Sequence, residues 1–278
     1  MIRVDAHHHV WRLDRGDYGW LQPTPDLAPI CRDFTLDELE PSLQAAGIAA
    51  TVLVQAAPTV AETRFLLACA RRRPDLVRGV VGWVDLGAPG AIAVLHGLSR
   101  NPQLKGIRPM LQDEADPDWI MRPDVQPALR AIAASGLRFD ALVKPHNLPA
   151  LREMLRCHPQ LRVVIDHAAK PDIAAGGWQP WADQIADIAA TTSACCKLSG
   201  LVTEAGPRWS VERLQGYVDH VLTCFGPDRV LWGSDWPVLT LASTYAQWDA
   251  ASDRLLSALS ADARDAIRGG NAVRLSGL

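Results

Sequence analysis

Three adjacent histidines stand in the segment VDAHHHVW at residues 4–11. Successive side chains on a β-strand point to opposite faces, so His7 and His9 share one face and His8 faces the other way, outside the barrel predicted below. Two neutral imidazoles two residues apart form a pincer suited to zinc or a similar ion. Asp5 shares their face one step deeper, where it can support a ligand. A purification-tag remnant is the alternative, but the histidines lie inside strand-like sequence.

Two later strand ends carry residues suited to acid–base and metal chemistry. The string VVIDHAAKP places His167 directly after an apolar run, with Lys170 in the turn that follows. The string VLWGSDWPV places Asp235 after another, where a carboxylate can bind a metal and take a proton from its water. The alternatives are a polar strand cap for His167, a solvated loop residue for Lys170 and a helix N-cap for Asp235.

Arg108 and His146 follow two other apolar strings, KGI and ALV. Arginine is permanently charged and carries a rigid fork of donors, so Arg108 at a strand tip can polarise a carbonyl or hold an anion. A surface salt bridge is the alternative for it. His146 can reach the same site from just beyond its strand, or it can be a loop histidine beside an Asn147 helix cap.

The elements that position these residues alternate along the chain between β-rich strings and helical patterns. The predicted strands are IRVDAHH, AATVLVQ, VRGVVGWV, LKGIRPM, LRFDALV, LRVVID, CCKLSG and RVLWGSD. Between them lie helical patterns such as FLLACARRR, preceded by a capping box of Thr59 and Glu62. Eight strand–helix units in about 250 residues predict a (β/α)8 TIM-type barrel, regular or distorted.

We expect this barrel to form a single catalytic domain over residues 1–278, since no interdomain linker interrupts the pattern. The segment from Asp14 to Phe34 is rich in Pro, Asp and Gly and is predicted to be a long loop over the catalytic mouth. An open doubly wound sheet is the structural alternative, but no GxGxxG motif follows the first strand.

Composition excludes several classes of partner. A net charge of −3 gives no basic footprint for nucleic acid or an anionic membrane. No basic start leads into an apolar signal core, and apolar runs such as GIAATVLV are too short to span a bilayer. Six cysteines without a CxxC pair indicate reduced thiols and a cytoplasmic protein. A homo-oligomer is compatible with the sequence.

The ordered strings DAHHHVW, KGIRPMLQ, VIDHAAKP, KLSGLVTEA and GSDWPV resemble the amidohydrolase superfamily over nearly the whole chain. Within it they are most similar to the sugar-lactonase branch of the amidohydrolase-2 family, which includes L-fuconolactonases, L-rhamnonolactonases and relatives of 2-pyrone-4,6-dicarboxylate lactonase. The string DAHHHVWRLDRGDYGWL looks most like the L-fuconolactonases. The resemblance implies hydrolysis of a small sugar-acid lactone to the open aldonate in sugar catabolism.

The resemblance also implies one divalent metal, zinc by preference. The implied ligands are His7, His9, Asp235 and either His167 or His146. Other amidohydrolase branches carry a lysine or glutamate at the end of strand four, often to bridge two metals, whereas this chain has Arg108 there. In that respect it resembles a branch with one metal or none, some of whose members hydrolyse lactones without requiring the metal.

The expected mechanism assigns Arg108, His146 or the metal to the lactone carbonyl. Asp235 takes a proton from the attacking water, and Asp235 or His167 returns one to the ring oxygen. The residues expected to contact the sugar from the mouth loops are Trp20, Lys170, Glu204, Trp209 and Trp236. The rivals are a metal-dependent decarboxylase of the same superfamily and a non-catalytic sugar-acid binding protein.

Overall fold

Eight parallel strands pair in chain order and form a nearly closed barrel, as the sequence predicts, in a computed structural model that describes residues 2–278. The strands are β1 (Arg3–His8), β2 (Ile48–Val54), β3 (Val77–Gly82), β4 (Leu104–Ile107), β5 (Arg138–Ala141), β6 (Arg162–Ile165), β7 (Cys195–Leu198) and β8 (Val230–Trp232). A parallel bridge between His8 and Trp236 joins the first strand to the segment after the last. The predicted (β/α)8 barrel is therefore confirmed.

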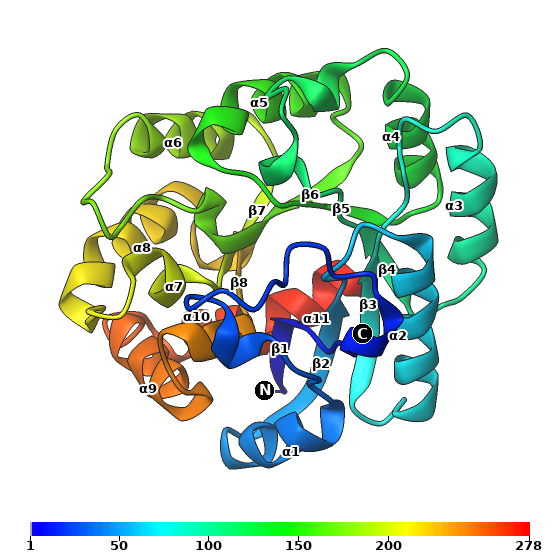
Figure 1. Cartoon of the computed structure of the whole chain (residues 1–278). Coiled ribbons are helices and arrows are strands. Elements are labelled where there is room, and N and C mark those ends of the chain that lie inside the picture. The colour runs from blue at the N-terminus through cyan, green and yellow to red at the C-terminus, as the bar shows by residue number, and fades with distance from the viewer. Residues whose placement is uncertain (1) are drawn as a thin grey trace.

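Helices surround the strands on the outside of the barrel (Figure 1). The longer ones are α1 (Leu36–Ala45), α2 (Val60–Arg72), α3 (Ala91–Ser99), α4 (Gln126–Ala134), α5 (Leu148–Cys157), α6 (Trp181–Thr191), α8 (Val211–Phe225) and α9 (Tyr245–Leu255). Three short helices complete the set: α7 (Leu201–Ala205), α10 (Ala261–Asp265) and α11 (Asn271–Ser276). Among the residues described, none of these helices is long and apolar enough to cross a membrane.

Of two helix caps predicted from the sequence, the one at Thr59 is partly correct and the one at Asn147 is wrong. The Thr59 side chain caps α2 by accepting the backbone N–H of Glu62 at 2.9 Å. The Glu62 carboxylate does not complete a capping box; it accepts the hydroxyl of Tyr18 at 2.7 Å and the N–H of Ala56 at 3.3 Å. Asn147 does not cap α5 with its side chain. For Glu62, a partner distant in sequence displaces the local bond, whereas the Asn147 side chain accepts the N–H of Lys144 at 3.0 Å in the turn before α5.

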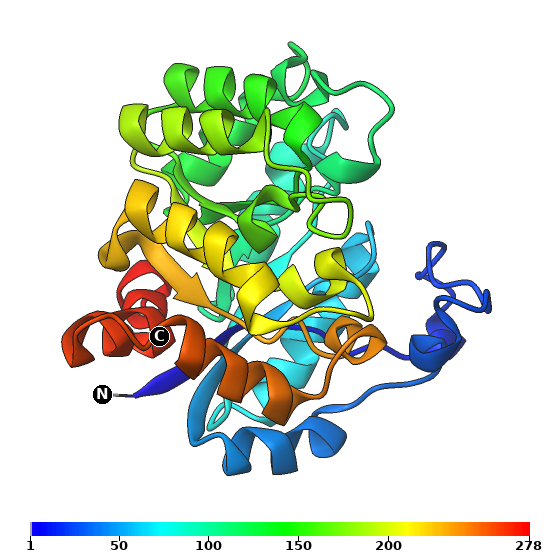
Figure 2. The same ribbon diagram turned by 90° about the vertical axis from the view of Figure 1, so that its left-hand side faces the viewer.

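The ends of the barrel differ in what covers them. The N-terminus and the C-terminal helices lie at one end, and the segment after β1 projects at the other (Figure 2). That segment holds two short 3-10 turns, Leu13–Arg15 and Ala28–Ile30, and returns beside β1 through backbone bonds between Trp11 and Phe34. The carboxyl ends of all the parallel strands open at this second end, which is where barrel active sites form.

Candidate active site

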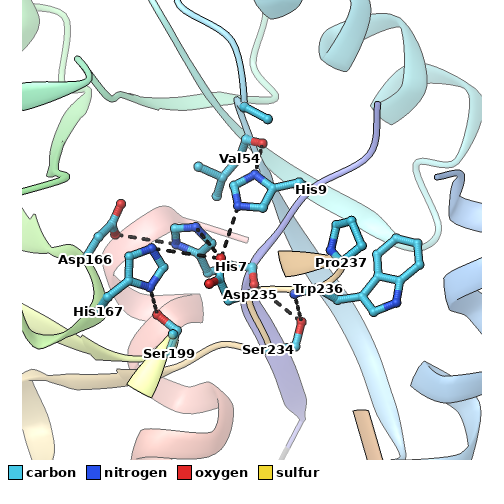
Figure 3. Close-up of polar contacts among 12 residues, drawn as sticks. His7, His9, Val54, Asp166, His167, Ser199, Ser234, Asp235, Trp236 and Pro237 are labelled. Carbon is cyan, nitrogen blue, oxygen red and sulfur yellow. Dashed lines mark hydrogen bonds and ion pairs between the residues drawn. The ribbon is translucent and has the colours of Figure 1, made fainter. Parts of the chain in front are cut away.

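β1 and the turn after β8 bring two histidines and a carboxylate together at the mouth (Figure 3). The N–H of Asp235 donates to the carbonyl oxygen of His7 at 2.8 Å, and the N–H of His9 donates to that of Trp236 at 2.7 Å. Asp235 has a left-handed backbone, with φ of 60°. Its carboxylate makes no helix-capping bond, so the N-cap interpretation of this residue is wrong.

Asp5 supports this junction from one layer below. Its carboxylate accepts the backbone N–H groups of His7 at 3.2 Å and Ser234 at 2.9 Å, and the hydroxyl of Tyr245 at 3.0 Å. Burial raises the pKa of Asp5 to about 6, although these donors oppose the shift. Asp5 therefore holds the two backbones that carry His7 and Asp235, whereas the sequence suggested support for an imidazole ring.

The donor atoms at the mouth fit a cation. His9 places Nδ1 2.8 Å from the carbonyl oxygen of Val54, which can only accept, so Nδ1 carries the proton. The lone pair of His9 Nε2 then faces Asp235 Oδ1 at 3.2 Å, a contact between two acceptors. His7 Nε2 lies 3.7 Å from the same oxygen. Two ligand atoms on a tetrahedral zinc lie roughly 3–3.5 Å apart, so this donor set suits such an ion.

His167 adjoins this group from the turn after β6. Its Nε2 lies 3.9 Å from Asp235 Oδ1, and its Nδ1 lies 2.9 Å from the hydroxyl oxygen of Ser199. Its ring centroid is 4.6 Å from that of His7. We call His7, His9, His167 and Asp235 the mouth cluster. All four side chains are buried.

Burial and neighbouring charge set the protonation of the mouth cluster. Burial acts to raise the pKa of Asp235, but the adjacent His167, His9 and His7 outweigh it and hold the pKa below its usual range. Burial lowers the pKa of His167 to about 4. It also lowers the pKa of His7 well below its usual value, and the nearby Lys197 charge adds to this. Near neutral pH Asp235 is therefore a carboxylate, and His7 and His167 are neutral imidazoles, the protonation state that a metal requires.

The turn that carries His167 is strained. His167, Ala168, Ala169 and Lys170 all have left-handed backbones, with φ between 50° and 60°. Side-chain crowding makes this conformation cost about 1–2 kcal/mol for each non-glycine residue. The indole N–H of Trp181 holds the turn by donating to the carbonyl of Ala168 at 2.7 Å. Strain of this kind tends to occur at functional sites.

A cavity of about 240 Å³ opens above Asp235. Its apolar wall comprises Trp11, Trp20, Ala56, Met110, Leu142 and Val238. Its polar lining comprises His9, Arg108, Gln112, Asp113, His167, Lys170 and Asp235. A small ring with an apolar edge and several hydroxyls matches this division. The predicted mouth loop contributes Trp20, whose indole N–H donates to the carbonyl of Ala56 at 2.7 Å.

Arg108 is buried in the cavity wall, so the surface salt-bridge interpretation is wrong. Its Nη1 lies 3.4 Å from Asp166 Oδ2 and 3.4 Å from His7 Nε2, and its Nη2 donates to the carbonyl of Gln55. A fixed guanidinium at this position can donate to a substrate oxygen.

Four of the candidate residues lie away from the cavity. His146 is exposed and lines a neighbouring pocket with Glu204; Lys170 lines both pockets, and its Nζ lies 3.7 Å from Glu204 Oε1. Trp209 donates its indole N–H to Ala242, and Trp236 packs its ring 5.2 Å from that of Phe34. Neither tryptophan lines the cavity, because their rings serve packing between loops.

Three buried charged residues near the site were missed by the sequence reasoning. Lys197 lies 2.5 Å from Asp140 and 2.8 Å from Asp166, and all three side chains are fully buried. A signal was present: each interrupts or ends an apolar strand string, in LRFDALV, VVID and CCKLSG. Charged residues are rarely buried unless they are paired.

The chain is similar to known proteins over nearly its whole length. The amidohydrolase family model, Amidohydro_2, matches residues 4–278. The L-fucono-1,5-lactonase of Burkholderia ambifaria is 47% identical over 278 residues, which cover 98% of this chain and 94% of the relative. The L-fucono-1,5-lactonase of Burkholderia multivorans is 36% identical over 287 residues, covering 98% and 95%. A crystal structure of a Burkholderia multivorans amidohydrolase with bound zinc superposes over 100% of both chains, with a TM-score of 0.94 and 36% identity.

Proposed function

Because this chain belongs to the amidohydrolase family, we propose that it hydrolyses the ring ester of a sugar-acid lactone to the open aldonate, in a sugar catabolic pathway. L-fuconolactone or a related aldonolactone is the proposed substrate, supported by the names of two relatives. The observation that carries the proposal is the buried Asp235 carboxylate, which faces two imidazole lone pairs on the floor of a small cavity. Residues 1–278 are proposed to act as one catalytic domain.

In the proposed reaction the lactone lies in the cavity with its carbonyl carbon above Asp235. Arg108 donates to the carbonyl oxygen and stabilises the negative charge that develops there. Asp235 accepts a proton from water as the water oxygen bonds to that carbon. The tetrahedral intermediate then collapses, the bond to the ring oxygen breaks, and the proton that Asp235 took from water passes to the ring oxygen, directly or through His167. His146 is not used, because it lies outside the cavity.

The proposed metal is one divalent ion, zinc by preference. His7, His9 and Asp235 would hold it, and His167 lies beside them as a further ligand. When bound, such an ion lowers the pKa of a water molecule and polarises a carbonyl. The lone pair of His9 Nε2 and the carboxylate of Asp235 are both acceptors and face each other at 3.2 Å. A cation between them would satisfy both, which supports this assignment.

The proposed sugar contacts come from two residues of the cavity wall, Trp20 and Lys170. The indole face of Trp20 suits the apolar edge of the ring, and the ammonium of Lys170 suits a hydroxyl or carboxylate oxygen. Glu204 acts on the sugar only through its ion pair with Lys170.

A pH-indicator screen of aldonolactones, run with and without a chelator, tests the proposal. We expect acid release with L-fuconolactone or a close stereoisomer, and slower release with the chelator if the metal takes part. Carbon dioxide release from aromatic or enol acids, with no lactone turnover, would identify a decarboxylase instead. Ligand-induced thermal shifts without any turnover would identify a binding protein.

A further inference from the structure

A chain of charged side chains crosses the inside of the barrel beneath the mouth cluster. The ammonium of Lys197 on β7 lies 2.5 Å from Asp140 Oδ2 on β5 and 2.8 Å from Asp166 Oδ1 at the end of β6. Since β5 and β7 are not neighbours in the sheet, the contact between them runs through the interior. We call Asp140, Asp166 and Lys197 the interior brace.

The interior brace continues in both directions. Towards the base, Asp140 Oδ1 accepts from Arg138 Nε at 2.7 Å, and Arg138 also donates to Ser276 of α11. Towards the mouth, Asp166 Oδ1 lies 3.5 Å from His7 Nδ1. The C-terminal helix is thereby linked through charged contacts to a residue of the mouth cluster.

Burying these charges is expensive. Removing a carboxylate or an ammonium from water costs several kcal/mol, and apolar side chains of similar volume often give equal or greater stability. Asp140 and Lys197 are fully buried, and neither touches the cavity. Stability alone therefore explains these buried charges poorly, and the contacts of Lys197 with His7 and Asp166 explain them better.

The partners of His7 indicate which of its nitrogens carries the proton. Arg108 can only donate, and its Nη1 lies 3.4 Å from His7 Nε2, so Nε2 presents a lone pair. Asp166 accepts, so Nδ1–H points to its carboxylate. Lys197 Nζ lies 3.3 Å from Nδ1 and can also only donate, with Asp140 and Asp166 near two of its three protons. A proton on Nε2 would point at the Arg108 guanidinium and leave the Asp166 carboxylate without a donor from His7, so the proton belongs on Nδ1. Nε2 is then the unprotonated nitrogen of His7, and it lies 3.7 Å from Asp235 Oδ1.

We propose that Lys197 is a positioning residue for His7: it holds the Asp166 carboxylate against Nδ1 and so keeps Nε2 free towards Asp235. The inference rests on the proposed function, because a free Nε2 matters most if the mouth cluster binds a metal. Without Lys197, Asp166 keeps Arg108 as its cationic partner and turns towards it. The His7 ring then loses the acceptor at Nδ1, and the 3.4 Å contact of Arg108 with Nε2 is too weak by itself to exclude the second tautomer.

The test uses the double variant Asp140→Asn/Lys197→Met, which removes one charge of each sign and leaves Asp166 paired with Arg108. In metal-free protein, ring ¹⁵N chemical shifts report the tautomer of His7, assigned by the signals lost in His7→Gln. We expect a single tautomer with Nδ1 protonated in the wild type and a mixture in the double variant. Zinc affinity, measured by competition with a chromophoric chelator, is expected to fall about 10–100-fold.

The matched control is Asp249→Asn, which breaks another largely buried ion pair, with Arg268, at the opposite end of the barrel. It is expected to lose stability and to keep the wild-type tautomer and zinc affinity. A wild-type tautomer of His7 together with a wild-type zinc affinity in the double variant would overturn the proposal. The interior brace would then have a structural role only. If the double variant does not fold, Asp166→Asn replaces it, because this change keeps the side-chain volume. We again expect a mixture of His7 tautomers and weaker zinc binding, and wild-type values of the two would again overturn the proposal. Neither readout uses a lactone, so a chain without lactonase activity leaves this test intact.

Discussion

Charged side chains gather at both ends of the barrel, but the carboxylates at the two ends face opposite kinds of hydrogen-bonding partner. At the base, Asp249 accepts from Arg3 at 2.7 Å and from Arg268, whose guanidinium lies 4.1 Å above the ring of Trp232. We call Arg3, Asp249 and Arg268 the basal cluster. At the mouth, Asp235 faces imidazole nitrogens that offer lone pairs instead of protons. The basal cluster pairs its carboxylate with donors from the chain, whereas the carboxylate of the mouth cluster faces acceptors.

This difference in the partners of the carboxylate distinguishes a structural cluster from a functional one, although the two contain similar residue types. Both contain a carboxylate and nitrogenous side chains, and both join β1 to elements near the end of the chain. What distinguishes them is what the carboxylate faces: Asp249 faces guanidinium donors, and Asp235 faces the imidazole acceptor of His9. A mismatch in a buried group costs stability, so a fold retains it where a ligand or substrate supplies the missing partner.

The largest expected effect is on turnover, from Asp235→Asn. Removal of the carboxylate removes the proposed base, and we expect kcat to fall by at least about 10²–10⁴-fold. The free energy of unfolding of metal-free protein should stay the same or rise, because an amide can donate to His9 where the carboxylate cannot. Initial rates on the lactone found in the screen, with urea unfolding, measure both. Near-normal kcat would reject the role of Asp235.

The opposite pattern is expected at the base. Asp249→Asn leaves the buried Arg268 with only the exposed Asp253 carboxylate, 3.7 Å away, and should lower the free energy of unfolding by about 2–4 kcal/mol. Its kcat at a temperature where it remains folded should equal that of the wild type. A loss of kcat without a loss of stability would erase the distinction between the two clusters.

The sequence predicts the barrel well because several strand strings are nearly continuous apolar runs that alternate with helical patterns. It also predicts the mouth cluster, since strand alternation pairs His7 with His9 and barrel topology places strand ends together. Two kinds of feature escape it. The capping bond expected of Glu62 is replaced by Tyr18, distant in sequence, and the partners of Lys197 are set by strands that do not neighbour it. Such contacts depend on three-dimensional register, which no local pattern contains.

Glu62 extends the comparison to a buried carboxyl that is neither basal nor in the mouth cluster. Burial raises its pKa to about 7, and Tyr18, Arg15 and Asp17 are the groups whose charge or hydrogen bonds modify that shift. The folded state therefore binds a proton more tightly than the unfolded chain. Its contribution to stability is complete below the ordinary glutamate pKa of 4.5 and is lost as pH rises through about 7.

Glu62→Gln should remove this dependence. Between pH 5 and 7 the free energy of unfolding of the wild type, relative to the variant, is expected to decrease by up to about 1 kcal/mol per pH unit. Urea titrations of both proteins at several pH values give that difference and cancel the histidines they share. A relative stability that increases with pH would show that Glu62 is held ionised by Arg15 instead.

The smallest expected effect concerns the left-handed turn that carries His167 into the mouth cluster. Ala169→Gly removes a buried methyl group but also removes the crowding of a left-handed alanine, and the two effects are of similar size. Ala189→Gly in α6 removes a similarly buried methyl from a regular helix and has no strain to relieve, so it should cost about 1 kcal/mol more. Urea titrations give the free energy of unfolding of the two variants. Equal losses of this free energy in Ala169→Gly and Ala189→Gly would show that the turn stores no strain. If Ala169→Gly leaves the free energy of unfolding nearly unchanged and lowers kcat, the strained turn positions His167. Such a loss of activity without a loss of stability is expected in the mouth cluster and not in the basal cluster.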